Sequence, residues 1–143
     1  MGVNEALFAL VAVLSEERRR PDSLAPVLEL MTIDDGGYPF CCLLSVRQIA
    51  VKGAEMYALV RGRRPNAHLV ERNRATLVFV HDNAFASLQL RTVASRPLGA
   101  ATLWTFEARE GTLDKRAEVL QPMSYRAPDL DEAEGPSIAD LLR

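Results

Sequence analysis

The chain has few of the residues that build disulfide frameworks and metal sites. Its 143 residues include only two cysteines and two histidines, and the cysteines are neighbours, Cys41 and Cys42. Two adjacent thiols cannot staple a small secreted fold, and two histidines leave little material for a metal centre. We therefore expect no metal, and a reducing compartment such as the cytoplasm.

The sequence also lacks an excess of one charge. Lysine and arginine number 17 against 19 aspartates and glutamates, a net charge of −2. This balance gives no general attraction to nucleic acid or to anionic membranes, although it is compatible with a local basic patch. The apolar run at residues 6–14 is far shorter than the about 20 residues of a membrane helix, and charged residues flank it on both sides. We expect no membrane segment, no signal peptide and no nucleic-acid partner.

The remaining composition, 48% hydrophobic and 25% charged, is typical of a soluble globular protein, and the length predicts one domain over residues 1–143. Helical spacing of apolar residues predicts an N-terminal helix at about 4–18. A mainly β fold with minor α follows, an antiparallel barrel or sandwich over about 25–110, and then a tail over about 111–143. The predicted strands are 27–33, 38–46, 56–60, 76–81, 87–95 and 101–109, with a short helix at 65–72.

Three local patterns refine this prediction. Asp34–Gly37 has the composition of a two-residue hairpin turn. Residues 77–80 are apolar without alternation, so both faces of that strand need a cover, and we favour a second subunit for the outer one. Ser137 with Asp140 resembles a capping box that starts a short C-terminal helix.

Arg61–Asn66 is the most informative segment for function. Pro65 is typical of the first position of a helix, which makes Arg64 the preceding cap, and arginine caps helices poorly. Free first-turn amides, the positive end of the helix dipole and three arginines would then meet at one place, a combination that suits a phosphate. A solvated basic turn is the alternative.

The segments follow a definite order along the chain. A turn with Gly36, Gly37 and Pro39 joins two strands, a later strand ends in the arginine turn, and Asn73-Arg74 follows the short helix. The apolar strand Leu77–Val80 then leads to Gln89-Leu90-Arg91. Over about residues 25–110 this order resembles the pyridoxamine 5′-phosphate oxidase-like family, the FMN-binding split barrels.

The resemblance implies a six-stranded antiparallel split β-barrel with an N-terminal helix and short connecting helices, and a homodimer that binds FMN at the subunit interface. The oxidases have Arg and Lys at the positions of Phe40 and Ser45, and Ser and Lys at those of Arg64 and Asn66. This chain therefore does not resemble a true pyridoxamine phosphate oxidase. Carried over by position, the cofactor-binding residues are Cys42, Leu43, Leu44, Ser45, Val60, Arg61, Arg64, Asn66 and Gln89.

These observations predict a small flavin-dependent oxidoreductase whose substrate is unknown and in which no side chain stands out as catalytic. An alternative on the same fold is a non-catalytic binder of flavin, haem or F420. A flavin-free β-barrel module, for instance for oligonucleotides, is a more distant alternative, because the basic cluster has no aromatic residue among its members.

Other candidate groups have simpler explanations. Cys41 and Cys42 would form a redox pair only if both thiols faced one way, whereas neighbours on a strand point to opposite faces. Gln89 and Arg91 alternate with Leu88 and Leu90, which is typical of a polar outer strand face as well as of a flavin contact. His81-Asp82 is compatible with a base and its orienting carboxylate, but a histidine that ends a strand beside a turn is the commoner explanation.

Overall fold

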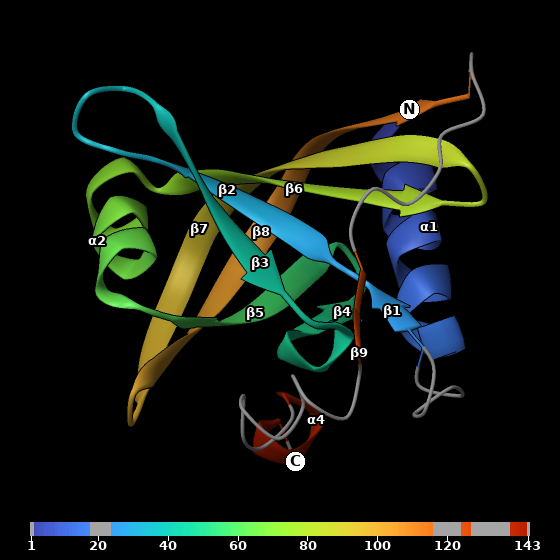
Figure 1. Cartoon of the computed structure of the whole chain (residues 1–143). Helices are drawn as coiled ribbons and strands as arrows, with labels where there is room; N and C mark the ends of the chain where they lie inside the picture. Colours follow the sequence, from blue (N-terminus) through green and yellow to red (C-terminus); the bar gives the residue numbers. More distant parts are fainter. Residues whose placement is uncertain (1, 18–23, 116–123, 127–137, 143) are drawn as a thin grey trace.

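The computed structural model describes residues 2–17, 24–115, 124–126 and 138–142, and its fold is mainly β with minor α (Figure 1). In chain order the elements are α1 (Gly2–Glu17), β1 (Leu24–Pro26), β2 (Leu28–Ile33), β3 (Pro39–Leu44), the 3₁₀ helix η1 (Val46–Gln48), β4 (Ile49–Lys52), β5 (Glu55–Arg61), α2 (Arg63–Arg72), β6 (Arg74–His81), β7 (Ala84–Leu98), β8 (Ala101–Asp114), β9 (Ser124–Arg126) and α4 (Ile138–Leu141).

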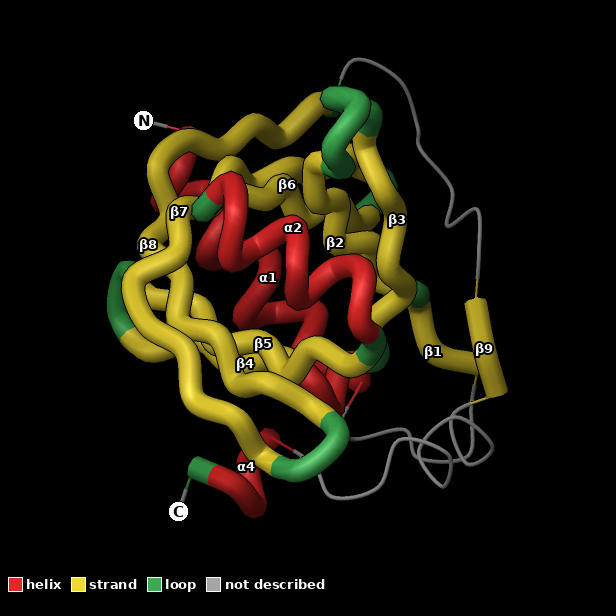
Figure 2. Tube along the Cα trace, turned by 90° about the vertical axis from the view of Figure 1, so that its left-hand side faces the viewer, coloured by secondary structure: helices red, strands yellow, loops and turns green. Residues whose placement is uncertain are grey.

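Seven strands form one antiparallel sheet in the order β3-β2-β6-β7-β8-β5-β4, and β1 pairs separately with β9. The sheet curls into a barrel that has α2 at one end and α1 at the other (Figures 1 and 2). The outermost strands, β3 and β4, are not paired with each other in the described part of the chain, so the barrel is split there. The predicted six strands omit β4, whose four residues are too short to show alternation.

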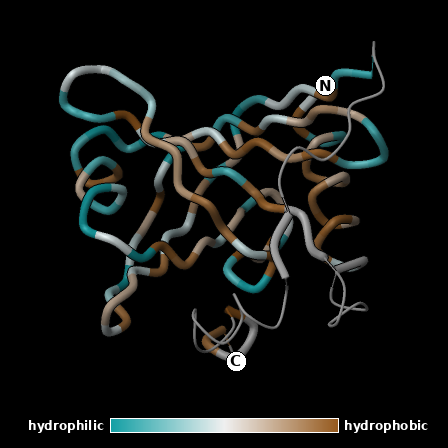
Figure 3. The backbone as a smooth tube through the Cα atoms, in the orientation of Figure 1, coloured by the Kyte–Doolittle hydropathy of each residue, from teal (hydrophilic) through white to brown (hydrophobic). Residues whose placement is uncertain are grey.

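The two ends of the barrel differ in polarity. α1 adds Ala6, Leu10 and Leu14 to the core, and it lies so close to β8 that a Cβ on Gly111 would be 2.8 Å from the Cβ of Ala6. Figure 3 shows α1 as mostly hydrophobic, whereas α2 and the β2–β3 turn are mostly hydrophilic. The polar end around α2 is therefore the end at which a hydrophilic ligand can approach the barrel.

The β2–β3 turn is longer than the predicted two-residue hairpin. The amide of Asp34 donates to the carbonyl of Tyr38 at 2.9 Å, and the Asp34 carboxylate accepts hydrogen bonds from the amides of Gly36 and Tyr38. Gly37 has φ = 83°, a backbone conformation that glycine adopts without strain. Asp34 thus shapes a five-residue connection, residues 34–38, rather than a tight turn.

β3 ends two residues before the predicted strand end. The Ser45 hydroxyl accepts a hydrogen bond from the Arg47 amide, and the Gln48 side chain accepts one from the Ser45 amide, which is a capping box for η1. Gln48 also donates to the carbonyl of Leu59 on β5 at 3.2 Å. This box links the two sides of the split.

The chain's end packs on the barrel. Ser137 of the predicted capping box lies outside the described residues, but α4 follows it, and Ile138 is completely buried against Leu59, Ala101 and Leu103. Among the described residues, no helix has the length and hydropathy needed to cross a membrane.

Candidate functional site

The start of α2 differs from the prediction. Its N-cap is Gly62, with φ = 97°, and the helix begins at Arg63, so the predicted cap at Arg64 is wrong and Pro65 is the third helical residue. Proline is tolerated there because amides in the first turn have no partner within the helix. No side chain among the described residues caps this end, which leaves the first-turn amides of Arg63 and Arg64 without a capping acceptor there.

The Asn66 side chain fixes the shape of this turn. Its Nδ2 donates to the carbonyl of Val60 at 3.1 Å and to that of Gly62 at 2.8 Å, while its Oδ1 accepts from Trp104 Nε1 at 2.7 Å. Both amide hydrogens are therefore used inside the chain. Asn66 remains a predicted FMN contact. In this structure its side chain fixes the turn that joins β5 to α2 and links that turn to Trp104 on β8.

Three side-chain contacts connect α2 to the β2–β3 hairpin. His68 is buried, and its Nδ1 lies 2.8 Å from Thr32 Oγ1 on β2. The edge of the His68 ring meets Phe40 with 5.4 Å between ring centroids, and the Arg64 guanidinium lies 5.8 Å from the Phe40 ring centroid. The structure thus brings the first turn of α2 to the start of β3.

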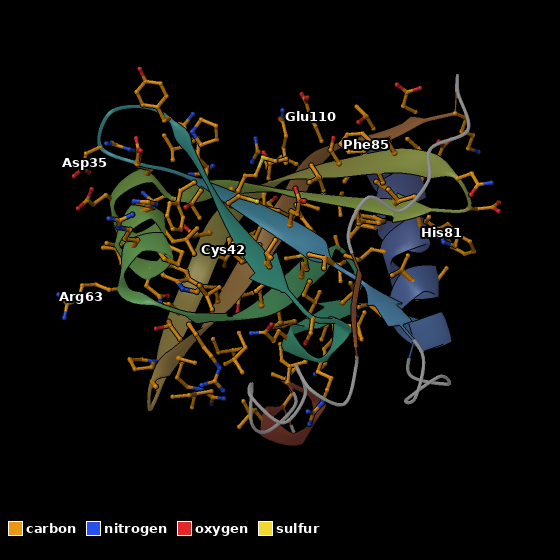
Figure 4. The ribbon with its side chains drawn as sticks, viewed as in Figure 1. Asp35, Cys42, Arg63, His81, Phe85 and Glu110 are labelled. Atoms are coloured by element: carbon orange, nitrogen blue, oxygen red, sulfur yellow. The ribbon has the colours of Figure 1, made fainter. Side chains whose placement is uncertain are left out.

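The turn has a concentration of positive charge. Arg63 and Arg64 are exposed, and no ion pair engages them within the described residues. Figure 4 shows Arg63 extending away from the barrel at the start of α2. Arg61 is half-buried beside them, and Val60 is fully buried and contributes its backbone only. Two uncapped amides and these arginines place hydrogen-bond donors and positive charge together, which is the chemistry that a phosphate needs.

The predicted FMN strand has two different faces. Cys42 and Leu44 point inward, since Leu44 is in the core and Cys42 packs against it, and Ser45 is buried in the η1 cap. Leu43 points outward and is 54% exposed. A ligand on the outside of the barrel therefore meets the side chain of Leu43 but only the backbone of its neighbours.

β3 also offers free backbone groups. The Asp34–Tyr38 hydrogen bond sets the register, and antiparallel alternation then directs the backbone groups of residues 40, 42 and 44 toward β2. The N–H and C=O groups of Cys41 and Leu43 point the other way, to the edge where no strand among the described residues pairs with β3. Such an edge can pair with a flat heterocycle that carries donors and acceptors.

Gln89 lies apart from this turn. It is exposed between the buried Leu88 and Leu90, which confirms the predicted alternation. It lines a hollow together with Arg72, at the C-terminal end of α2, a helix about 15 Å long. A single chain therefore does not bring Gln89 to the arginine turn.

Burial lowers the reactivity of both cysteines. It raises the pKa of the Cys42 thiol to about 11, with a further contribution from neighbouring Cys41. The pKa of the Cys41 thiol is raised by partial burial first and then by the charge and hydrogen bonding of Glu29. The two thiols lie on opposite faces of β3 and are free, so the structure favours structural roles over a redox pair.

The His81-Asp82 pair also has a structural explanation. His81 ends β6, Asp82 adopts φ = 50° in the following turn, and both line a hollow of about 920 Å³ beside Phe8 of α1. No hydrogen bond joins the two side chains in the described part of the chain. The described residues also contain no group of three or more potential metal ligands.

No protein-family model and no curated protein matches this sequence. Solved structures match its fold. An FMN-binding protein from Syntrophomonas wolfei subsp. wolfei has a TM-score of 0.60 at 12% identity, over 77% of this chain and 86% of that one. The styrene monooxygenase flavin reductase from Pseudomonas putida S12 has 0.57 at 6%, over 71% and 88%. An F420 reductase has 0.51 at 8%, over 61% and 89%. At these identities the likeness establishes the fold alone: the chain has the split β-barrel fold.

Replacing Asn66 with alanine should loosen the arginine turn. The change leaves two carbonyls and the Trp104 indole N–H without their partner, and we expect the free energy of unfolding to fall by about 2 kcal/mol. Trp104 is the chain's one tryptophan, so its fluorescence reports the change directly. Urea unfolding of Asn66→Ala and of the exposed control Ala67→Ser measures both effects. Equal stability of the two variants would contradict the structural role of Asn66.

Cys41 should react slowly with iodoacetamide at pH 7.5 although its side chain is exposed, because a raised pKa leaves little thiolate. The rate should climb steadily as the pH is raised to 10. Glu29→Gln removes a charge that disfavours the thiolate and should speed the reaction several-fold at pH 8. Mass spectrometry of the modified peptide follows the rate. No acceleration in Glu29→Gln would show that Glu29 does not control this thiol.

Proposed function

We propose that this protein is an FMN-binding flavoprotein that acts as a small flavin-dependent oxidoreductase. The observation that carries the proposal is the meeting of two features: the uncapped, arginine-bearing first turn of α2 and the unpaired edge of β3. Arg64 above Phe40 marks the place where they meet. The shared fold of a flavin reductase and an FMN-binding protein supports the same conclusion.

The residues present fit the chemistry of FMN. Its phosphate needs cations and amides, which Arg64 and the first-turn amides of α2 provide. The flavin ring needs an apolar surface and hydrogen bonds to its polar edge, which the Leu43 side chain and the backbone of Cys41 and Leu43 provide. FMN supplies hydride or electron transfer when it is bound, and the protein's part is to bind, orient and shield it.

The proposal includes a cytoplasmic homodimer. Gln89 lies apart from the arginine turn within one chain, so the dimer is inferred from the outer face of the sheet instead. Apolar side chains lie exposed on the outside of the sheet: Leu43 is 54% and Phe85 41% exposed. The same face of a second copy would pack on these side chains and would cover the outside of the apolar strand β6, as predicted from the sequence.

A non-catalytic binder on the same fold is the second candidate, and haem or F420 remain alternative ligands. The likeness in fold to an F420 reductase makes F420 the specific competitor. Visible spectroscopy separates the candidates. FMN that stays bound through desalting and is bleached by a reduced nicotinamide supports the oxidoreductase. FMN that stays bound but is not bleached by any electron donor supports the non-catalytic binder. Retention of F420 but not of FMN would identify F420 as the cofactor.

Arg64→Ala should weaken FMN binding roughly tenfold, because it removes one charge-assisted hydrogen bond to the phosphate. Quenching of flavin fluorescence during titration measures the affinity. Lys52→Ala is the matched control, since it removes one positive charge from the exposed β4–β5 turn, far from α2. Equal affinities in the wild type and in Arg64→Ala would remove the phosphate assignment, whereas an equal loss in Lys52→Ala would show a general charge effect.

Light scattering should report about twice the mass of one chain for the purified protein. Leu43→Glu places a charge in the proposed interface and should shift the mass toward one chain. Val70→Glu is the control, because Val70 is 66% exposed on α2 and outside the proposed interface. A wild-type protein that is monomeric both with and without FMN would refute the dimer.

A further inference from the structure

A second polar concavity lies at the other end of α2 from the arginine turn. It is a hollow of about 790 Å³ over the outer face of β2, β6, β7 and β8. Arg74 and Arg91 line it, together with Arg72 and Arg109. Figure 4 places Glu110, on the rim of this hollow, well apart from Arg63 at the start of α2. The hollow is therefore separate from the proposed phosphate site of FMN.

Arg74 and Arg91 are an unusual pair. They are direct cross-strand neighbours in the β6–β7 register, where side chains start about 5 Å apart and like charges destabilise the sheet. On the other side of Arg91, Glu107 of β8 is its direct cross-strand partner but forms an ion pair with Arg109, and Arg72 pairs with Asp35. Within the described residues no acidic group is paired with Arg74 or Arg91. An anion between them would turn a repulsive pair into an attractive site.

The rest of the lining adds two further properties. Thr76 and Gln89 lie on the floor as hydrogen-bonding groups, and no hydrogen bond within the described residues engages their side chains. Met31, Ile33 and Pro39 form an apolar wall, with Ile33 directly opposite Pro39. A ligand that fills the hollow therefore combines adjacent negative charges with a flat apolar part and polar ring edges.

We propose that this hollow binds a nucleoside diphosphate. The diphosphate lies between Arg74 and Arg91, the base lies against the Met31–Ile33–Pro39 wall, and Gln89 and Thr76 offer hydrogen bonds. A diphosphate fits better than a single phosphate because two guanidinium groups face it from neighbouring strands. The proposal does not depend on flavin binding: it assigns Gln89 to a ligand within its own chain instead of to FMN, and the FMN site then consists of the arginine turn and the edge of β3.

The test is calorimetric titration of the full chain with ADP, in the absence and in the presence of saturating FMN. We expect ADP to bind more tightly than AMP, adenosine or inorganic pyrophosphate, and to bind whether or not FMN is present. Affinity should fall as salt is raised, because exposed arginines carry much of the interaction.

Variants that should change the affinity for ADP in opposite directions test the site directly. Arg91→Gln and Arg74→Gln should each weaken ADP binding roughly tenfold. Glu110→Gln should tighten it several-fold, because it removes the one carboxylate among the described residues that line the hollow. Lys52→Ala, which changes the net charge far from the hollow, should leave the affinity unchanged. All four side chains are exposed, so the fold should be preserved, and circular dichroism verifies this.

Several outcomes would overturn the proposal. Pyrophosphate that binds as tightly as ADP would leave the apolar wall without a role, and adenosine that binds as tightly would leave the arginines without one. Displacement of ADP by FMN would assign the hollow to the flavin site. Tighter binding of a single-stranded oligonucleotide than of ADP would indicate a nucleic-acid surface. Unchanged affinity in both arginine variants would remove the site.

Discussion

The split between β3 and β4 is the constraint on which the candidate site depends. In the part of the chain that the structure describes, the seven-stranded sheet curls without closing and leaves β3 with a partner on one side only, and the Ser45–Gln48 capping box links the split without filling it. Unpaired backbone groups at a sheet edge need water, another chain or a ligand. Here the edge begins beside a helix end that carries two arginines and lacks a cap, so its surroundings favour an anionic, heterocyclic ligand.

Hydrogen bonds at both ends of α2 fix the position of the helix relative to the barrel. Asn66 joins the start of the helix to β5 and β8, and His68 joins its middle to Thr32 on β2. At the far end Arg72 donates to the carbonyl of Asp34, and Asn73 accepts a hydrogen bond from the Thr92 amide. One helix held in this way presents a different polar surface at each end, and the two proposed binding sites follow from that.

Sequence patterns predicted the secondary-structure elements better than the tertiary contacts between them. Alternation placed Gln89 on an outer face, and a composition of glycine, proline and arginine located the turn before α2. Local signals failed where a tertiary feature decides: Pro65 is compatible with several first-turn positions, and the positive φ of Gly62 selects the start. The contact of Asn66 with Trp104 spans 38 positions in the chain, so no local pattern reveals it. The distance from Gln89 to the turn depends on strand order, which periodicity does not encode.

Hydrogen–deuterium exchange with and without FMN tests the central claim most directly, because the site is assigned to particular amides. Slower exchange on FMN addition is expected at Cys41 and Leu43 on the free edge of β3 and at Arg63 and Arg64 in the first turn of α2. The inward-bonded amides of Cys42 and Leu44 serve as internal references and should change little. Unchanged exchange at the amides of Cys41, Leu43, Arg63 and Arg64, or protection that appears only elsewhere in the barrel, would contradict the account.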